Sequence, residues 1–214
     1  MWRTIHVDNL DKPWLDDKYE KMTCNAVDRS VGGLIDLDIE GFGSDKLRSY
    51  VASRSSQLKR LRLAICTNIS VKALKGALKK LSCLEELELT ICKFRGKNTV
   101  PLINSCPSVT TFKLNRIYQK SKCDKEALAI ARSMPELRHL QLIGNNMTYD
   151  GLTAILDGCR HLQSLDLRWC YNLDNAQKLD KRLSANIKDL RRPFDSNEEF
   201  RLQTLVNATK SYAC

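Results

Sequence analysis

Cysteine and histidine are the residues of this sequence best suited to metal or redox chemistry. Zinc sites usually draw thiolates and imidazoles from close local pairs. No two of the 9 cysteines form a C-x-x-C pair, and the 3 histidines are not spaced as a pair. We therefore predict reduced thiols that act as small buried apolar groups, with no metal and no cofactor. The positions are Cys24, Cys66, Cys83, Cys92, Cys106, Cys123, Cys159, Cys170, Cys214, His6, His139 and His161.

Other catalytic signatures are also missing from the sequence. It contains no recognisable nucleophile–base pair and no motif for a metal cluster. The runs Gly32-Gly33 and Gly41-Phe42-Gly43 are too short for a phosphate-binding loop and are typical of turns. We predict that the protein is not an enzyme.

Positive charge is in excess and is partly clustered. The 35 lysines and arginines outnumber the 25 aspartates and glutamates, which gives a net charge of +10. Such a cluster can attract nucleic acid, an anionic membrane or an acidic protein, or it can form a solvated face. Tyr50 is its only aromatic residue, so stacking on single-stranded bases has little support. The cluster spans residues 46–82, which hold no acidic residue, and consists of Lys46, Arg48, Arg54, Lys59, Arg60, Arg62, Lys72, Lys75, Lys79 and Lys80.

The hydropathy pattern bears on the cellular location. Uncharged apolar runs are only a few residues long, too short to span a membrane. The first residues lack the apolar stretch of a secretory signal. We expect an intracellular protein of the nucleus, the cytoplasm or both, without a membrane partner. Its 214 residues suit one domain or one elongated repeat array.

A repeated segment, L-x-x-L-x-L-x-x-C/N, is the strongest pattern in the sequence. Its complete copies are Leu58–Cys66, Leu84–Cys92, Leu137–Asn145 and Leu162–Cys170. Weaker copies begin at Leu34 and Val109, and a degenerate one at Trp2. The spacing of the copies falls within the period of about 20–29 residues that defines leucine-rich repeats.

Each copy predicts a strand, a turn and a helix. The Leu-x-Leu alternation buries one face of a short strand, and the Cys or Asn side chain lies inside the turn. Leu74, Leu78 and Leu81 then recur at helical spacing, with Ser70 and Thr148 as candidate helix caps. Stacked copies give an α/β fold, a right-handed leucine-rich-repeat solenoid. We expect about six or seven parallel strands on its concave face and helices on its convex face.

The repeat boundaries divide the chain into four parts. Residues 1–33 are predicted to form a degenerate N-terminal capping repeat, and residues 34–170 the leucine-rich repeats. Residues 171–193 are predicted to form a C-terminal capping helix, because Leu179, Leu183, Ile187 and Leu190 recur at helical spacing. Residues 194–214 have no repeat phase and form a tail of uncertain order.

The variable positions of the strands form the candidate binding face. The third position holds Asp36, Arg60 and Glu86 in neighbouring copies, which alternate in charge. Such rows can form a self-neutralising ladder, a polar recognition surface, or both. The fifth position holds Asp38, Arg62, Glu88, Lys113, Gln141 and Asp166.

The eighth position lies at the rim of the strands. It holds Ile65, Ile91, Arg116, Gly144 and Trp169. Exposed large apolar groups at a rim are good binding candidates. Trp169 is therefore a candidate contact, with packing on its neighbours Tyr171 and Leu173 as the alternative.

Several strings resemble the plant F-box/LRR-repeat family, over about residues 1–195 of this chain. They include Ala26–Ser30, Ser55–Ala64, Ala127–Ala131, Met134–Leu142 and Ile187–Pro193. The resemblance implies cysteine-containing repeats that hold a protein destined for ubiquitination. It also implies an F-box before the repeats, which binds the Skp adaptor of an SCF ubiquitin ligase.

The resemblance leads to our expectation for function. The sequence shows no F-box helical segment ahead of Met1, so we expect a substrate-recognition module without the adaptor-binding part. Its target is an unidentified protein, and the Skp adaptor and cullin join only through an F-box supplied elsewhere. Two alternatives remain: a scaffold or dominant-negative fragment outside any ligase, and nucleic-acid binding through the helix face of Lys72–Lys80, which the sequence favours less.

Overall fold

A computed structural model describes residues 2–10, 12–94, 96–117, 120–173, 183 and 187–195. The strands form a single all-parallel sheet in which each strand pairs with the next one along the chain. This α/β leucine-rich-repeat architecture confirms the predicted fold class. The strands are β1 Thr4–Asp8, β2 Asp36–Glu40, β3 Arg60–Ala64, β4 Glu86–Thr90, β5 Thr111–Asn115, β6 His139–Gln141, β7 Ser164–Asp166 and β8 Asp189–Arg191.

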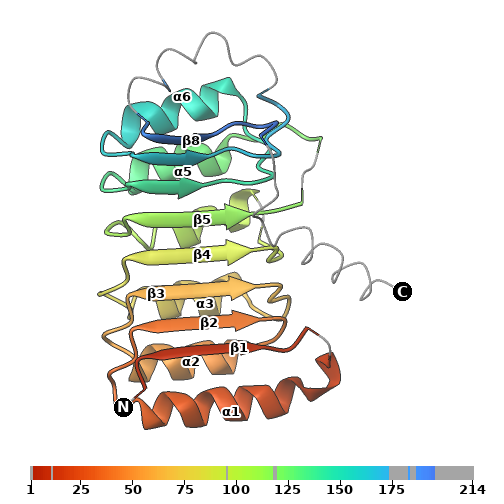
Figure 1. The fold of residues 1–214 in the computed structure, drawn as a ribbon, viewed down its shortest axis with the longest axis vertical. Helices are drawn as coiled ribbons and strands as arrows, with labels where there is room; N and C mark the ends of the chain where they lie inside the picture. Colours follow the sequence, from red (N-terminus) through yellow and green to blue (C-terminus); the bar gives the residue numbers. More distant parts are fainter. Residues whose placement is uncertain are drawn as a thin grey trace.

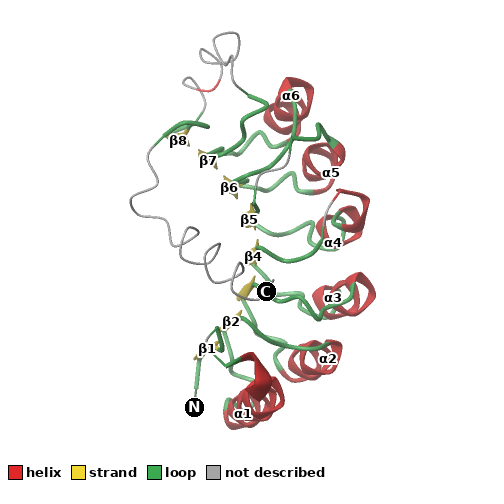
Figure 2. Ribbon diagram, turned by 90° about the vertical axis from the view of Figure 1, so that its right-hand side faces the viewer, coloured by secondary structure: helices red, strands yellow, loops and turns green. Residues whose placement is uncertain are grey.

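The helices cover one side of this sheet. Figure 2 shows the strands along the inner side of an arc and the helices along its outer side, so the sheet forms the concave face. None of the described helices is long and apolar enough to cross a membrane. The helices are α1 Asp16–Arg29, α2 Asp45–Arg54, α3 Val71–Leu78, α4 Val100–Ile103, α5 Lys125–Ser133 and α6 Tyr149–Gly158, and single 3₁₀ turns span Pro13–Leu15 and Gly96–Asn98.

The repeated leucines build the core between the two layers. Leu37, Leu61, Leu87, Phe112 and Leu140 occupy the same register position on five neighbouring strands. All of them are buried. Because the side chains of a strand alternate between faces, the charged residues between them lie on the concave face.

The cysteine at the end of the repeat lies inside the turn that follows the strand. The thiol of Cys92 donates to the carbonyl of Leu63 at 3.4 Å, and that of Cys170 donates to the carbonyl of Leu142 at 3.0 Å. Each acceptor belongs to the preceding repeat, so the thiol ties neighbouring repeats together. Cys66, Cys92 and Cys170 are fully or almost fully buried, which confirms their predicted interior position.

Both predicted helix caps are confirmed. Ser70 Oγ accepts a hydrogen bond from the Ala73 amide at 3.1 Å at the start of α3. Thr148 Oγ1 accepts one from the Asp150 amide at 3.3 Å at the start of α6. Each hydroxyl satisfies an amide that has no partner within its own helix.

The C-terminal part of the sheet differs from the expectation. We predicted about six or seven strands, but the sheet has 8. The last one, β8, lies in the segment for which a helix up to Pro193 was predicted, so the helical assignment is wrong for residues 189–191. Leu190 pairs with Leu165 of β7 and continues the row of core leucines, so β8 covers the otherwise open edge of β7.

Leu179 and residues 196–214 lie outside the described residues, and the four-part division remains a prediction.

Candidate protein-binding face

Arg62 lies at the centre of the charged row on the concave face. The strand register places it between Asp38 of β2 and Glu88 of β4. Its guanidinium contacts both carboxylates, with Nη1 2.7 Å from Asp38 Oδ1 and Nε 3.0 Å from Glu88 Oε1. The predicted alternation of charge is therefore a set of real ion pairs.

A third carboxylate gives the half-buried Arg62 a structural role as well. Its Nη1 lies 2.6 Å from Glu40 Oε2, and the Glu40 side chain is 0% exposed. Burial alone would lower the pKa of the Arg62 guanidinium, but hydrogen bonds and attraction from Asp38, Glu88 and Glu40 outweigh it and raise that pKa above its ordinary value. Arg62 is therefore always charged and neutralises a buried acid.

Lys113 joins the third-position row to the fifth-position row. Its Nζ lies 2.5 Å from Glu86 Oε1 and 3.7 Å from Glu88 Oε2. Arg60 bridges Asp36 at 3.4 Å and Glu86 at 3.6 Å. The charges over β2–β5 thus largely satisfy one another, as a self-neutralising ladder does.

A hydrogen-bond relay continues this ladder across the sheet, and the sequence did not reveal it. Thr90 donates to Glu88 Oε1 at 2.8 Å, and Asn115 donates to Thr90 Oγ1 at 3.0 Å. Gln141 then donates to Asn115 Oδ1 at 3.1 Å. Thr90 and Asn115 occupy the seventh position of their repeats and are 1% exposed. The only sign of this relay in the sequence is that both residues are polar at a position of the repeat that is buried.

The concave face is hollowed over β5–β8. This hollow has a volume of about 370 Å³. Lys113, Gln141 and Asp166 line it, whereas Asp38, Arg62 and Glu88 lie outside it. The remaining lining residues are Thr111, His139, Leu140, Ser164, Arg168, Asp189 and Arg191.

Two residues of the hollow have clear local roles. Asp166 is only 8% exposed, and Arg168 Nη2 lies 2.6 Å from its Oδ2. Arg191 stands opposite Asp166 in the register of β8. The sequence pattern did not indicate Arg191, because the spacing of the apolar residues in this segment predicted a helix.

Trp169 at the rim is half-buried. It packs against buried Ile143 in a small cluster that also includes Ile91. Tyr171, named with Leu173 as the alternative packing partner of Trp169, has its ring centroid 5.6 Å from that of Phe194. Tyr171 is 40% exposed and Phe194 is 68% exposed, so both add apolar surface to the rim.

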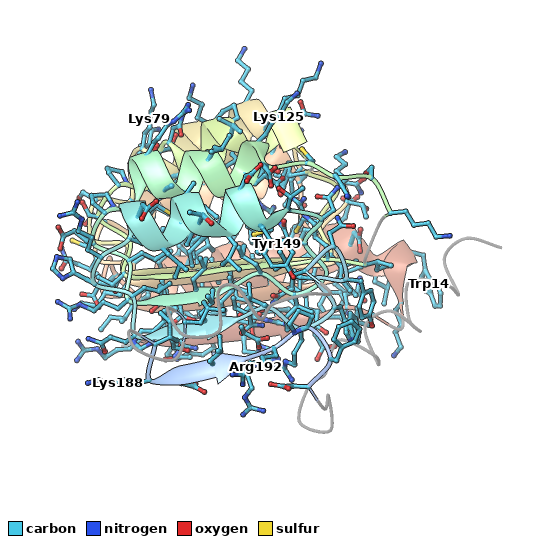
Figure 3. The ribbon with its side chains drawn as sticks, turned by 90° about the horizontal axis from the view of Figure 1, so that it is seen from above. Trp14, Lys79, Lys125, Tyr149, Lys188 and Arg192 are labelled. Carbon is cyan, nitrogen blue, oxygen red and sulfur yellow. The ribbon has the colours of Figure 1, made fainter. Side chains whose placement is uncertain are left out.

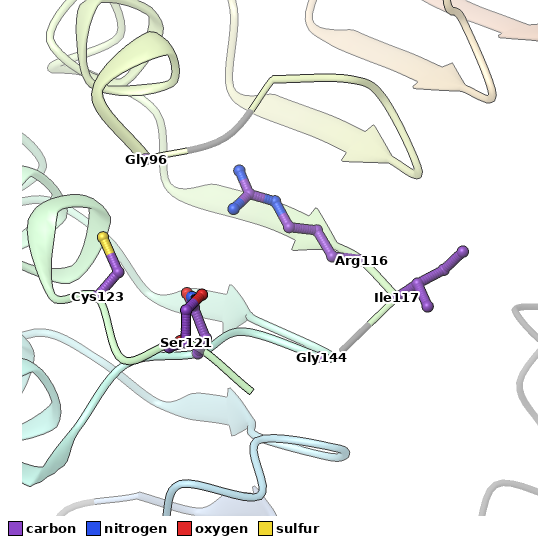
Figure 4. A pocket seen from close by; sticks show the side chains of 7 residues that line it. Gly96, Arg116, Ile117, Ser121, Cys123 and Gly144 are labelled. Carbon is purple, nitrogen blue, oxygen red and sulfur yellow. The ribbon is translucent and has the colours of Figure 1, made fainter. Parts of the chain in front are cut away.

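Arg116 does not join the rim. It is buried, and its guanidinium forms a two-armed ion pair with Glu126 at 2.7 Å for each arm. It also donates to Thr99 Oγ1 at 2.9 Å, while Asn145 donates to Glu126 at 3.2 Å. This network anchors α5 to the turns after β5 and β6. A cavity of about 180 Å³ lies beside it, with Ser121 and other residues at its wall (Figure 4).

Comparison with known proteins identifies a repeat family and several plant relatives that are similar to this chain. A leucine-rich-repeat family model matches residues 134–156 and 158–171. The chain is 47% identical to putative F-box/LRR-repeat protein 23 of Arabidopsis thaliana over 203 residues, which cover 92% of this chain and 45% of that protein. It is 46% identical to the F-box protein SKIP19 of the same plant, over 92% of this chain and 65% of that protein.

A further relative matches over most of its own length. Putative F-box/LRR-repeat protein 21 of Arabidopsis thaliana is 37% identical over 219 residues, which cover 94% of this chain and 70% of the relative. The chain thus spans about half of one relative and about two thirds of the others. The matched part contains the repeats.

Proposed function

The chain belongs to the F-box/LRR-repeat protein family, and we propose that its concave face and rim bind a target protein for an SCF ubiquitin ligase. Within that family the repeats are a protein-interaction module. The observation that carries the proposal is the hollow over β5–β8, which places polar side chains of four strands on one rigid surface. Little conformational freedom is lost when a partner binds such a frame.

The proposed contacts fall into two groups. Lys113, Gln141 and Asp166 line the hollow, and Trp169 with Tyr171 supplies apolar surface at the rim. Charged groups mainly steer association and set specificity, while a partly buried aromatic side chain contributes more to retention.

The remaining predicted contacts are Asp38, Arg62 and Glu88. They form the ladder beside the hollow, and their mutual ion pairs leave less charge for a partner. We propose that they set the shape and neutrality of this part of the face and contact a partner only at its edge.

The test compares captured proteins between matched variants. The chain and its Lys113→Ala/Gln141→Ala variant are used for proximity labelling in plant cells, with Lys21→Ala/Lys188→Ala as a control outside the hollow. Circular dichroism first verifies that all three fold. We expect proteins labelled by the wild type and the control to be lost from the hollow variant. Identical labelling by all three would refute the proposed face.

Recruitment of the ligase is a separate claim. We propose that residues 1–214 hold a target but need an F-box supplied elsewhere to engage the Skp adaptor, because the described part of the chain is occupied by repeats. Purified chain mixed with a Skp adaptor should therefore elute separately in size-exclusion chromatography. Co-elution in a stable complex would refute this division of roles, while loss of target capture would refute the concave-face proposal.

A further inference from the structure

The basic cluster of residues 46–82 splits into two populations. Arg54 pairs with Asp28 at 3.2 Å and Lys59 pairs with Glu85 at 2.7 Å. Arg60 and Arg62 belong to the concave ladder, and Arg48 is 3% exposed. These five residues are therefore neutralised or buried and contribute little to a surface field.

The other five members are all lysines of the outer helix layer. None of them makes an ion pair with any residue in the described ranges. Within and just after α3, Lys72 and Lys75 are three residues apart, and Lys75 and Lys79 are four apart, so they are neighbours of like charge that repel. The five are Lys46 at α2, and Lys72, Lys75, Lys79 and Lys80 at α3.

Figure 3 shows where this charge points. Lys79 projects from the helix layer away from the sheet, as does Lys125 of α5, whereas Lys188 lies on the sheet side. The positive field of the convex face is thus directed away from the concave hollow. A partner attracted by it would not compete with one bound on the sheet.

A groove between α2 and α3 lies within this basic surface. It has a volume of about 310 Å³. Its lining includes the small residues Ala52, Ala73, Ala77 and Gly76. A Cβ added at Gly76 would meet no atom within 4 Å, which shows that the groove is open at that point.

Three charged residues line the groove. Lys72 and Lys80 line it. Asp45 also lines it, but its Oδ1 accepts a hydrogen bond from the Ser70 amide at 2.7 Å. That carboxylate is therefore held against the start of α3, and Lys72 and Lys80 outnumber it among the residues that line the groove.

We propose that the α2–α3 groove binds an acidic segment of a partner protein in which apolar side chains alternate with carboxylates. The apolar side chains would pack on the alanine and glycine residues of the lining, and the carboxylates would pair with Lys72 and Lys80. The lining residues include no aromatic side chain on which single-stranded bases could stack, which favours a peptide over single-stranded nucleic acid. A concave groove also favours a narrow peptide over a membrane surface. This site is independent of the proposed concave-face function.

A fluorescence-anisotropy titration tests the proposal with a defined probe. The probe is a short fluorescein-labelled peptide composed of glutamate and leucine. Two matched peptides replace every glutamate by glutamine or every leucine by serine. We expect binding of the first peptide only, with an affinity that falls as salt is raised because the ion pairs are exposed. No binding of the glutamate–leucine peptide at low salt overturns the proposal.

Variants of the chain separate charge from shape. Lys72→Glu/Lys80→Glu should weaken binding about tenfold or more, since two exposed ion pairs are each replaced by repulsion. Lys21→Glu/Lys188→Glu changes the net charge equally outside the groove and should leave affinity unchanged. Gly76→Leu should block the groove while preserving the helix, and Gly76→Ala should weaken binding far less.

Three further outcomes would overturn the proposal. Equal binding by the wild type and by the Gly76→Leu variant would show that the groove is not used. Equal binding of the leucine-to-serine peptide would show attraction of any polyanion. Tighter binding of a single-stranded oligonucleotide or of phosphatidylserine vesicles, lost in Lys72→Glu/Lys80→Glu, would assign the lysines to those partners instead.

Discussion

Arg62 and Arg60 are neighbours on one strand, yet their surroundings differ greatly. The side chain of Arg60 is 59% exposed and reaches its partners at 3.4 and 3.6 Å. The Arg62 side chain is 20% exposed and contacts Glu40, which is fully buried. Exposed ion pairs contribute little to stability, whereas removal of one partner from a buried pair leaves a charge without compensation. The same residue type therefore has two different roles on β3.

We predict that Arg62→Met lowers the free energy of unfolding by about 3 kcal/mol or more. Arg60→Met is the matched control and should lower it by less than about 1 kcal/mol. Urea unfolding at neutral pH measures both. Adding Glu40→Gln to Arg62→Met should restore part of the loss, because the buried acid is then neutral. Equal losses for the two arginine variants would contradict the assignment.

The buried thiols predict a sensitivity to alkaline pH. Burial raises the pKa of Cys66 to about 11 and that of Cys92 to about 12. An unfolded chain ionises its thiols at a pKa of about 8.5, so above that pH the unfolded state is favoured and stability is lost up to the folded-state pKa. Each such thiol contributes a slope of about 1.4 kcal/mol per pH unit in this window.

We predict that stability falls between about pH 8.5 and 11 more steeply in the wild type than in a Cys66→Ala/Cys92→Ala variant. Below this range both states are protonated at these thiols, and the two proteins should share the same pH dependence. Urea midpoints measured across the range compare the slopes. Parallel curves at all pH values would show that these thiols ionise alike in both states.

At the scale of the element, two helical glycines illustrate opposite constraints. Gly76 in α3 has open space at its Cβ position, whereas a Cβ at Gly158 in α6 would overlap the backbone of Ala131. Alanine has the higher helix propensity, by about 1 kcal/mol. We predict that Gly76→Ala stabilises the protein by about that amount and that Gly158→Ala destabilises it. Thermal unfolding measures both, and a gain from Gly158→Ala would show that α5 and α6 can move apart.

Several elements could be predicted from sequence because their signals are local and periodic. The leucine pattern indicated the parallel strands, Cys92 and Cys170 marked the interior turns, and Ser70 marked a helix start. The β8 strand could not be predicted in this way. Three residues are too few to show a period of two, and the spacing of Leu190 from its upstream leucines also suits a helix.

The candidate site likewise has contacts that the sequence pattern predicts and contacts that it does not. Alternation of charge along the row predicted the ion pairs of Arg62, since register alone brings them together. The pair of Arg116 with Glu126 and the shielding of Asp166 by Arg168 depend on how side chains fold back around a turn. No fixed spacing reports such contacts. The charge pattern therefore predicted the row and left both a self-neutralising ladder and a recognition surface open, and the ion pairs of Arg62 are those of a ladder.

The whole molecule separates its charges by face. Ion pairs within the sheet neutralise much of the concave side, while the lysines of α3 leave the convex side positive. Because the net charge is +10, long-range attraction of acidic partners should act mainly on the convex side and should weaken with salt. The two faces can therefore serve different partners on one frame.

The stacking of the repeats also determines how far a destabilising substitution affects the rest of the sheet. Each repeat contacts mainly its neighbours, so stability is close to a sum of repeat and interface terms. Ile5 is 4% exposed on β1, which pairs with β2 at the end of the sheet. Phe112 is 0% exposed on β5, between β4 and β6. Truncation of either side chain to alanine should cost about 2–5 kcal/mol locally.

We predict that the two truncations differ in reach. Ile5→Ala should reduce hydrogen-exchange protection only in β1 and α1, because opening the end repeat leaves the remaining interfaces intact. Phe112→Ala should reduce protection on both sides of β5, because it weakens two interfaces and allows the halves to open separately. Hydrogen–deuterium exchange with peptides covering β1, β3, β5 and β7 resolves these regions. A uniform loss of protection in Ile5→Ala would instead mean that the repeats unfold as one cooperative unit.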